Sequence, residues 1–586
     1  MFIPYAGVSK EKPVVFWEEP ISPPGKRVLF GVLFTFMEEL SVLIGGKAGD
    51  GINSAGMVVA HLFNRIGYRV YMYFDYPSLI KGGHNFAIVR AAKEKIGAHR
   101  SQVDFILALN QDTVDFHQDM VHGKTVALFD RSRVRAEGIG IDLTQILKEE
   151  KAPPVMGNSC IIGAFAKAAG IEWKVLEEVF ARQVPKALAL NLKVALRGFD
   201  GARECCRIGP LTSSTLPVIS GNEAIGLGLI HGGLDAYVAY PMTPTSNILH
   251  FMAEVAETHD LRVFHPENEI AVMMMALGLG YAGKRTAVGT SGGGFCLMTE
   301  GFSLSGMNEI PVVVVLGQRA GPSTGMPTYT AQSDLQFALH AGQGEFPRLV
   351  VAPGDAEQAY AWSDLSLQIS WKYQVPAVIL CDKTLCEGFY SFSRPDSEIP
   401  RIGLPPEASP GPAYSRYLMS ENGVSPMLSP PREETVIKVN GYTHDQAGIT
   451  TEKAELASLM SEKRQKKGAA LASGISSLNP VVIGGDTGSD SALICWGSTV
   501  GVCREVAAAL GLRLVQPVVL SPLPEQVLQD ALRGTDRQIV VEENAEGQLA
   551  MLLARHGIRP DSHIRRYDGR PFTVEELEAR AREVLA

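Results

Sequence analysis

Apolar runs alternate along this chain with polar loops and with segments of helical periodicity. Between residues 236 and 381, five apolar runs predict buried strands: 236–240, 285–290, 311–316, 348–352 and 375–381. Helical segments separate these runs. This alternation predicts a parallel sheet that is covered by helices on both faces, so the expected fold class is α/β.

The N-terminal part shows the same pattern once more. Residues 41–44 predict a buried strand, 45–51 a glycine-rich loop and 52–66 a helix. A glycine loop at a helix N-terminus can approach a phosphate, because the first amides of the helix are free. Its glycine spacing is not Gly-x-Gly-x-x-Gly, however, and no acidic residue obviously serves a ribose. Taken alone, the loop is better interpreted as a tight turn without a ligand.

The C-terminal part differs in composition. Residues 394–490 are rich in proline, which predicts an extended connector with one polar helix at 452–467. The basic run Lys463-Arg464-Gln465-Lys466-Lys467 within it is interpreted as a solvated helix face. The last hundred residues return to α/β, with strands at 492–496 and 538–541 and a capped amphipathic helix at 573–585.

Length and charge narrow the class of protein. At 586 residues the chain should form three or four domains, each with its own core. A net charge of −9 gives no uniform field for nucleic acid or anionic membranes, and no apolar run reaches the roughly 18 residues that span a bilayer. Eight irregularly spaced cysteines argue for a reducing compartment, so we expect a cytoplasmic protein.

The first 36 residues stand apart. Residues 27–36 are apolar enough to resemble the core of a signal peptide, but Met37-Glu38-Glu39-Leu40 offers no small-residue cleavage site. We therefore expect an appended N-terminal arm, or translation that begins upstream of the true start.

Four polar loops follow the predicted strands. Their sequences are YPMTPTS (240–246), PENE (266–269), TSGGG (290–294) and GQRAGPSTGMPT (317–328). Because the carboxyl ends of parallel strands meet at one edge of a sheet, these loops should lie together, where open α/β folds bind ligands.

The sequences and spacing of these four loops resemble those of the pyrimidine-binding domain of the 2-oxoacid:ferredoxin oxidoreductases. Those enzymes use thiamine diphosphate to decarboxylate a 2-oxoacid onto coenzyme A, and they pass the electrons to ferredoxin. The glycine loop at 45–51 and the segment 76–85 resemble the family's gamma domain, and 497–498 with 541–548 resemble its transketolase-C-like domain.

The resemblance implies a multidomain α/β chain with five parts. These are an arm (1–36), a Rossmann-like gamma domain (37–205), a pyrimidine-binding thiamine-diphosphate domain with a parallel sheet (206–393), a proline-rich connector (394–490) and a transketolase-C-like domain (491–586).

Glu269 is the candidate catalytic residue. It precedes the apolar helical segment 270–278, and a glutamate in the first turn of a helix is usually only a partner of the helix dipole. The resemblance instead implies that Glu269 is the glutamate that activates thiamine, since a carboxyl kept away from water can share a proton with a ring nitrogen. Glu267 competes for this role, in a less suitable register.

The candidate substrate and cofactor contacts lie on the neighbouring loops. Arg319 closely follows a strand, so its guanidinium can bind a carboxylate in two places, although a surface salt bridge is the alternative. The resemblance implies that Arg319 binds the substrate carboxylate and that Thr243 and Thr328 add polar contacts. Further candidates are Thr290, Ser291 and Gly292 for the cofactor pocket, unless the glycines serve only as a turn, and Lys81 for coenzyme A, unless it is a solvated loop lysine.

Other parts of a complete thiamine enzyme are missing. Such enzymes hold Mg²⁺ and the diphosphate with Gly-Asp-Gly and an asparagine well downstream. Here Gly49-Asp50-Gly51 has Asn53 too close, and residues 485–488 depart from the motif. No cysteines have the close spacing of an iron–sulfur site. The resemblance thus implies no metal on this chain and a beta subunit that carries Mg²⁺, the diphosphate site and a [4Fe-4S] cluster.

The implied assembly is a dimer of heterodimers that is inactive without beta. The sequence of residues 319–328 most resembles that of enzymes that act on 2-oxoglutarate, which is therefore the expected substrate. Pyruvate or branched-chain 2-oxoacids are the alternative substrates. Two other classes of protein stay open: a non-redox thiamine-diphosphate transferase and a non-catalytic assembly subunit.

Overall fold

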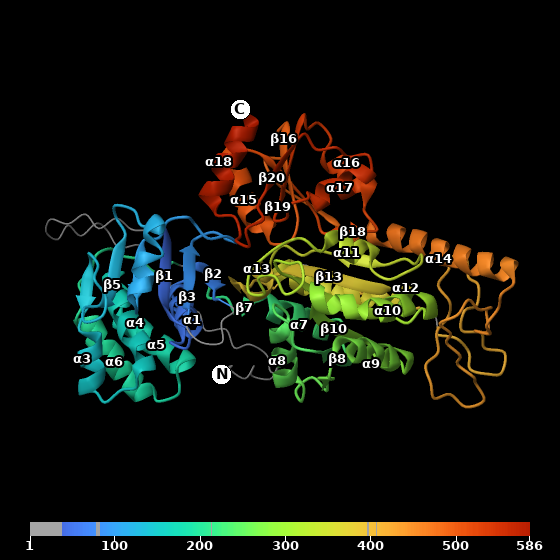
Figure 1. The fold of residues 1–586 in the computed structure, drawn as a ribbon, viewed down its shortest axis with the longest axis horizontal. Helices are drawn as coiled ribbons and strands as arrows, with labels where there is room; N and C mark the ends of the chain where they lie inside the picture. Colours follow the sequence, from blue (N-terminus) through green and yellow to red (C-terminus); the bar gives the residue numbers. More distant parts are fainter. Residues whose placement is uncertain (1–37, 78–82, 212–213, 395–397, 406) are drawn as a thin grey trace, which may run out of the picture.

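A computed structural model describes residues 38–77, 83–211, 214–394, 398–405 and 407–586. It contains three sheets, of eight, seven and five strands. Figure 1 shows the first and second sheets side by side, with the C-terminal sheet above their junction. The multidomain α/β prediction is confirmed. None of the described helices has the length and apolar character that crossing a membrane requires.

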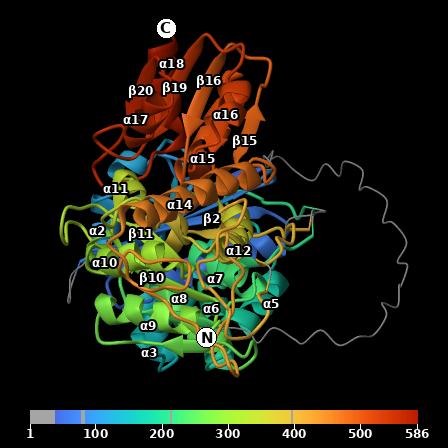
Figure 2. The same ribbon diagram turned by 90° about the vertical axis from the view of Figure 1, so that its right-hand side faces the viewer.

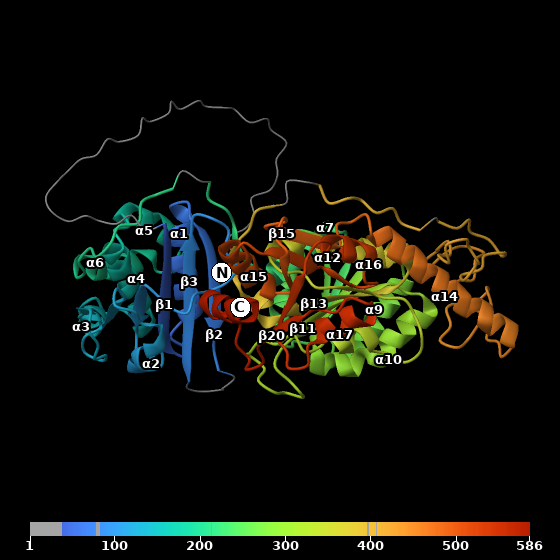
Figure 3. The same ribbon diagram turned by 90° about the horizontal axis from the view of Figure 1, so that it is seen from above.

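The first sheet is mixed. Strands β1, β4, β5 and β6 run parallel, whereas β3 and β2 pair antiparallel to their neighbours. Figure 3 shows α4, α5 and α6 on the face turned away from the second sheet. The order is β6 (Ile139–Ile141), β5 (Val126–Asp130), β4 (Phe105–Ala108), β1 (Glu39–Lys47), β3 (His84–Ala92), β2 (Arg69–Asp75), β14 (Phe389–Ser391) and β7 (Val218–Ser220). The helices are α1 (Ile52–Arg65), α2 (Gln111–Asp115), α3 (Leu143–Glu149), α4 (Gly157–Ala168), α5 (Trp173–Gln183) and α6 (Leu188–Asp200), with short 3-10 turns at Gln118–Met120 and Pro154–Met156.

The last two strands of this sheet come from far along the chain. β14 pairs antiparallel with β2 and with β7, so main-chain hydrogen bonds continue from the N-terminal part of the chain into the part after residue 206. This pairing covers the outer edge of β2, which would otherwise expose unpaired amide and carbonyl groups.

The second sheet is parallel except for one edge strand. All five strands predicted between residues 236 and 381 are present, and β18 adds antiparallel to β12. The order is β18 (Val519–Ser521), β12 (Leu349–Val351), β13 (Pro376–Asp382), β11 (Val312–Gln318), β10 (Thr286–Ser291), β8 (Ala236–Ala239) and β9 (Arg262–Phe264). Its helices are α7 (Gly221–His231), α8 (Ser246–Val255), α9 (Glu269–Tyr281), α10 (Gly292–Asn308), α11 (Leu335–His340), α12 (Ala356–Tyr373) and α13 (Lys383–Glu387).

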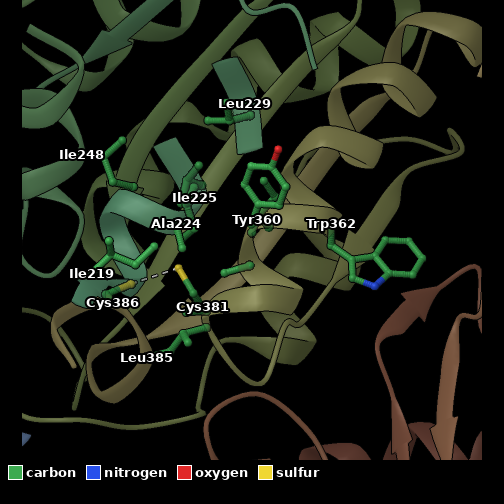
Figure 4. Packing of buried hydrophobic residues seen from close by; sticks show 14 of the residues in the cluster. Ile219, Ala224, Ile225, Leu229, Ile248, Tyr360, Trp362, Cys381, Leu385 and Cys386 are labelled. Atoms are coloured by element: carbon green, nitrogen blue, oxygen red, sulfur yellow. Dashed lines mark hydrogen bonds between the residues drawn. The ribbon is translucent and has the colours of Figure 1, made fainter. Parts of the chain in front are cut away.

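A continuous apolar core lies under α7 and α12 (Figure 4). Leu229 of α7 and Tyr360 of α12 point into it, and the Sγ atoms of Cys381 and Cys386 lie 3.2 Å apart at its base. Burial of each large apolar side chain contributes about 1.5–3 kcal/mol. This packing holds the central strands of the sheet, and with them the loops at its carboxyl edge.

The third sheet contains three strands that the sequence pattern did not predict, at Val481–Gly485, Arg513–Pro517 and Ser562–Arg565. β15 (Val481–Gly485) lies within the expected connector and pairs antiparallel with β17. Pro480 and two glycines flank or end this short run, which hides its strand signal. The order is β15, β17 (Arg513–Pro517), β16 (Ser491–Cys495), β19 (Arg537–Glu542) and β20 (Ser562–Arg565). The helices are α15 (Thr499–Leu510), α16 (Glu525–Ala531), α17 (Gln548–Arg555) and α18 (Val574–Leu585).

The prediction of a solvated basic face on the connector helix is wrong. Helix α14 (Ala454–Ile475) lies between the second sheet and the C-terminal part (Figure 2), and its Lys463 and Lys467 are fully buried. Both ammonium groups donate to the carboxylate of Glu309, at 2.7 and 2.5 Å. Burial lowers the pKa of Lys467 to about 7, because removal from water disfavours the charged ammonium group. The carboxylate of Glu309 opposes this shift, and the neighbouring ammonium group of Lys463 adds to it.

Candidate active site

The carboxyl ends of β8, β9, β10 and β11 lie at one edge of the second sheet, because these strands are mutually parallel. The four polar loops of the sequence leave from this edge. The structure therefore places Thr243, Glu269, Thr290–Gly292 and Arg319 on neighbouring strand ends. Lys81 lies outside the described residues.

Glu269 is the first residue of α9 and is buried, with 6% of its surface exposed. The Asn268 side chain accepts a hydrogen bond from the Ala271 amide at 2.9 Å, which starts the helix and sets the direction of Glu269. The carboxylate lies against Gly294 in the first turn of α10, where an added Cβ would be 2.6 Å from Glu269 Oε1. The competing Glu267 is exposed to solvent.

Strand β10 ends in two fully buried hydroxyl residues, Thr290 and Ser291. Thr245 Oγ1 donates to the Thr290 carbonyl at 3.2 Å, whereas Ser291 Oγ is buried without a hydrogen-bond partner. An unpaired buried hydroxyl is costly, so Ser291 marks a place where a ligand can supply the missing bond.

Arg319 directly follows β11 and is half-buried. Its Nη1 donates to the Thr243 carbonyl at 3.2 Å, so two of the predicted substrate residues touch. The contact uses the backbone of Thr243 and not its hydroxyl. Burial lowers the pKa of the Arg319 guanidinium, against the opposing charge of Asp334, and an arginine remains a cation throughout the physiological range.

The loop after Arg319 folds back on itself. The Met326 amide donates to the Ala320 carbonyl at 2.8 Å, and the Ala320 amide donates to the Tyr329 carbonyl at 3.1 Å. This return brings Thr328 close to the start of the loop. Thr328 is buried, and its Oγ1 lacks a hydrogen-bond partner, as Ser291 Oγ does.

Sequence reasoning missed one charged group at this edge, Asp334. The order Ser333-Asp334-Leu335 is typical of an ordinary helix start, and α11 does begin at Leu335. The Asp334 carboxylate nevertheless makes no capping hydrogen bond. It lies over Gly292, where an added Cβ would be 2.6 Å from Asp334 Oδ2. Asp334 is recognised as part of this edge only because the structure shows that its carboxylate lies next to Gly292, which is far from it in sequence.

Comparison with known proteins decides the family. Residues 227–463 match the family described as pyruvate flavodoxin/ferredoxin oxidoreductase, thiamine diphosphate-binding, and residues 41–201 match pyruvate ferredoxin/flavodoxin oxidoreductase. The chain is 30% identical to 2-oxoacid:ferredoxin oxidoreductase 2, subunit alpha, of Aeropyrum pernix, over 94% of this chain and 98% of that protein. The chain belongs to the 2-oxoacid:ferredoxin oxidoreductases.

Two further relatives of this oxidoreductase subunit bear names that specify 2-oxoglutarate. The 2-oxoglutarate oxidoreductase subunit KorA of Mycobacterium tuberculosis is 28% identical, over 70% of this chain and 65% of that protein. The solved 2-oxoglutarate:ferredoxin oxidoreductase of Magnetococcus marinus, with 2-oxoglutarate, coenzyme A and succinyl-CoA bound, superposes with a TM-score of 0.87. It is 30% identical and covers 94% of this chain and 100% of that chain.

The residues at the sheet edge fit the pyrimidine half of thiamine diphosphate, which this oxidoreductase domain binds. Glu269 is a buried carboxylate that would face a ring nitrogen, and Ser291 Oγ is a buried hydroxyl that lacks a partner. Beside them the Cβ position of Gly293 is open, with Met242 Cε at 4.0 Å as its nearest neighbour. A flat ring can approach the main chain there because no side chain intervenes.

Gly294 provides a sharp test of this oxidoreductase site. Gly294→Ala should displace the Glu269 carboxylate, since the new methyl group would overlap Thr290 Oγ1 and lie 2.6 Å from Glu269 Oε1. We expect kcat of the co-expressed complex to fall by roughly 10²-fold. Gly468→Ala, within helix α14, is the matched control, because the nearest atom to its added Cβ is Pro347 Cβ at an ordinary contact distance of 3.5 Å. Equal kcat values for the two variants would show that the position of Glu269 does not matter.

Proposed function

We propose that this chain is a fused gamma–alpha subunit that acts in the oxidative decarboxylation of 2-oxoglutarate, giving succinyl-CoA, carbon dioxide and reduced ferredoxin. The observation that carries the proposal is the placement of a buried glutamate and a half-buried arginine at one edge of a parallel sheet. The preference for 2-oxoglutarate is supported by the named activities of the Mycobacterium tuberculosis and Magnetococcus marinus relatives.

Each site residue has a role in this proposal. Arg319 binds the carboxylate next to the ketone, while the hydroxyls of Thr243 and Thr328 donate to the substrate's oxygens. When bound, thiamine diphosphate supplies the carbon nucleophile and accepts the electron pair that carbon dioxide leaves behind. Glu269 shares a proton with the pyrimidine ring nitrogen, and Thr290, Ser291 and Gly292 line the ring's pocket. Fixed groups of this kind lower the barrier because they need no reorganisation as charge develops.

The domains keep their expected roles in the proposal. Residues 37–205 form the gamma domain, 206–393 the pyrimidine domain and 491–586 the transketolase-C-like domain. Lys81 of the gamma domain is proposed to contact coenzyme A. The cysteine pattern supports a cytoplasmic location.

A beta subunit is proposed to complete the site. Beside Glu269, the apolar side chains Ile270, Met274 and Leu297 are each about half exposed, at 54%, 47% and 50%. They line a groove of about 510 Å³ between α9 and α10. Exposed apolar patches of this kind are typical of protein interfaces. We propose that beta covers this face, carries Mg²⁺, the diphosphate site and a [4Fe-4S] cluster, and passes electrons to ferredoxin within a dimer of heterodimers.

Assay of the co-purified complex against a panel of 2-oxoacids tests the proposal. With coenzyme A and a viologen dye, we expect kcat/KM to be highest for 2-oxoglutarate. A maximum for pyruvate or a branched-chain 2-oxoacid would identify that acid as the substrate instead. A complex that contains no iron and reduces no dye, yet transfers a ketol group, would be a transferase.

A further inference from the structure

We propose that Asp334 is the titrating partner of Arg319, and that it takes up one proton from solvent when the carboxylate of the substrate binds this arginine. The inference rests on the proposed function, because it takes Arg319 as the residue that binds the substrate's carboxylate.

The position of Asp334 is fixed from two sides. Its amide donates to Gln318 Oε1 at 2.9 Å, and Gln318 is the last residue of β11, directly before Arg319. Its carboxylate lies over Gly292, the first residue of α10 and a member of the predicted cofactor pocket. Asp334 is thus held between the arginine that binds substrate and the strand end that binds cofactor.

The carboxylate of Asp334 has no structural task in its own helix. At other helix starts Asp355, Asp382 and Asn268 each accept a hydrogen bond from the amide three residues ahead. Asp334 occupies the same position at α11 without such a bond. Within the described residues its carboxylate oxygens have neither a hydrogen bond nor an ion pair within 4.0 Å, so they are available to respond to a ligand.

The charges around Asp334 define how it responds. Burial raises the pKa of Asp334 to about 6, against the opposing charge of Arg319. Helix α11 packs against β13, which ends at Asp382, and against α17, which carries Arg555. Helix α10, over which the Asp334 carboxylate lies, begins with three uncharged glycines. Among the charges of this region, Arg319 is the one that acts on Asp334.

A bound substrate changes that balance. Its carboxylate adds a second negative charge beside the same guanidinium, and a like charge raises the pKa of a neighbouring carboxyl group further. Protonation of Asp334 then removes the repulsion between the two carboxylates. Substrate binding is therefore strongest below about pH 6, where Asp334 is already protonated, and weakens as the pH rises.

Calorimetry on the co-purified complex measures this proton directly. The probe is 2-hydroxyglutarate, which keeps the carboxylate but has no ketone to react. Titrations at pH 7 in phosphate and in Tris, which differ in ionisation heat, give the protons taken up per ligand bound. We expect about half a proton or more for the native complex and for Asp334→Glu, and none for Asp334→Asn.

Steady-state kinetics give a second readout. At pH 8, Asp334→Asn should lower KM for 2-oxoglutarate on the order of tenfold while kcat stays within about twofold, because only the repulsion is removed. Its KM should also be flat between pH 6 and 8, where the native KM rises. Asp334→Ser should match Asp334→Asn, since serine can start a helix but carries no charge. Asp142→Asn is the matched control, an aspartate at the start of α3 that also makes no capping bond and lies near an arginine.

Several results would overturn the inference. They are proton uptake that persists in Asp334→Asn, a KM that rises in this variant, or different behaviour of the asparagine and serine variants. If one variant does not fold, the other still decides. A native complex that does not bind the probe and reduces no dye with any 2-oxoacid would instead overturn the proposed function.

Discussion

Glu269→Gln is expected to lower kcat of the co-expressed complex by about 10²- to 10⁴-fold, which is the usual contribution of a positioned proton-transfer group. The amide has nearly the shape of the carboxyl group but cannot share a proton with a ring nitrogen. KM for the 2-oxoacid should change little, because the Glu269 carboxylate lies against Gly294, whereas the hydrogen bond of the Arg319 side chain within the described residues goes to the Thr243 carbonyl. Initial-rate measurement with saturating coenzyme A and dye checks this.

The neighbouring Glu267→Gln is the matched control for Glu269. It removes the same charge two residues away, from a side chain that is exposed to solvent. Its kcat should equal the native value. If Glu267→Gln is the damaging change and Glu269→Gln is not, the assignment of the two glutamates is reversed.

Arg319→Ala is expected to act on kcat/KM. Loss of one partner of a hydrogen-bonded charge pair costs about 2–5 kcal/mol, or roughly 30- to 5,000-fold in kcat/KM. Arg319→Lys should fall between alanine and arginine, because lysine keeps the charge but cannot bind a carboxylate in two places. A kcat/KM profile over several 2-oxoacids measures both variants.

The chain also supplies a control for Arg319. Arg285 precedes β10 at the opposite, amino edge of the same sheet, is half-buried, and donates through Nη1 to the Gly232 carbonyl at 2.7 Å. Arg285→Ala removes a comparable interaction at the edge of the sheet opposite to the proposed ligand site. Any loss of activity in Arg285→Ala should result from a lower stability of the complex, with KM for the 2-oxoacid unchanged. Turnover that survives both Glu269→Gln and Arg319→Ala, with the complex intact, would show that this chain is a non-catalytic subunit.

The parallel sheet could be predicted because its signal is local. Central strands of such a sheet are buried on both faces, so Val312–Leu316 is a continuous apolar run that stands out in any window. β15 gave no such signal, since it is short and ends in glycines. The buried lysines of α14 were invisible for a different reason: their partner Glu309 is 154 and 158 residues away along the chain.

The same distinction applies to the site. Glu269, Thr243 and Arg319 were predicted from motifs on separate loops that resemble those of the family, yet no local pattern predicts that Arg319 donates to the Thr243 carbonyl across 76 residues. Asp334 was missed because its surroundings look like any helix start. Its environment is created by Gly292, which leaves room for a carboxylate only after the sheet has formed.

The strands shared between sheets restrict how this subunit can be divided. β14 pairs with β2 through Phe389 and Tyr390, and β18 pairs with β12. A cut near residue 205 would therefore separate β14 from β2, and a cut near residue 490 would separate β18 from β12. A piece produced alone would present a bare β edge, which is a template for polymerisation. Experiments on its parts are therefore best made by point substitution in the whole polypeptide.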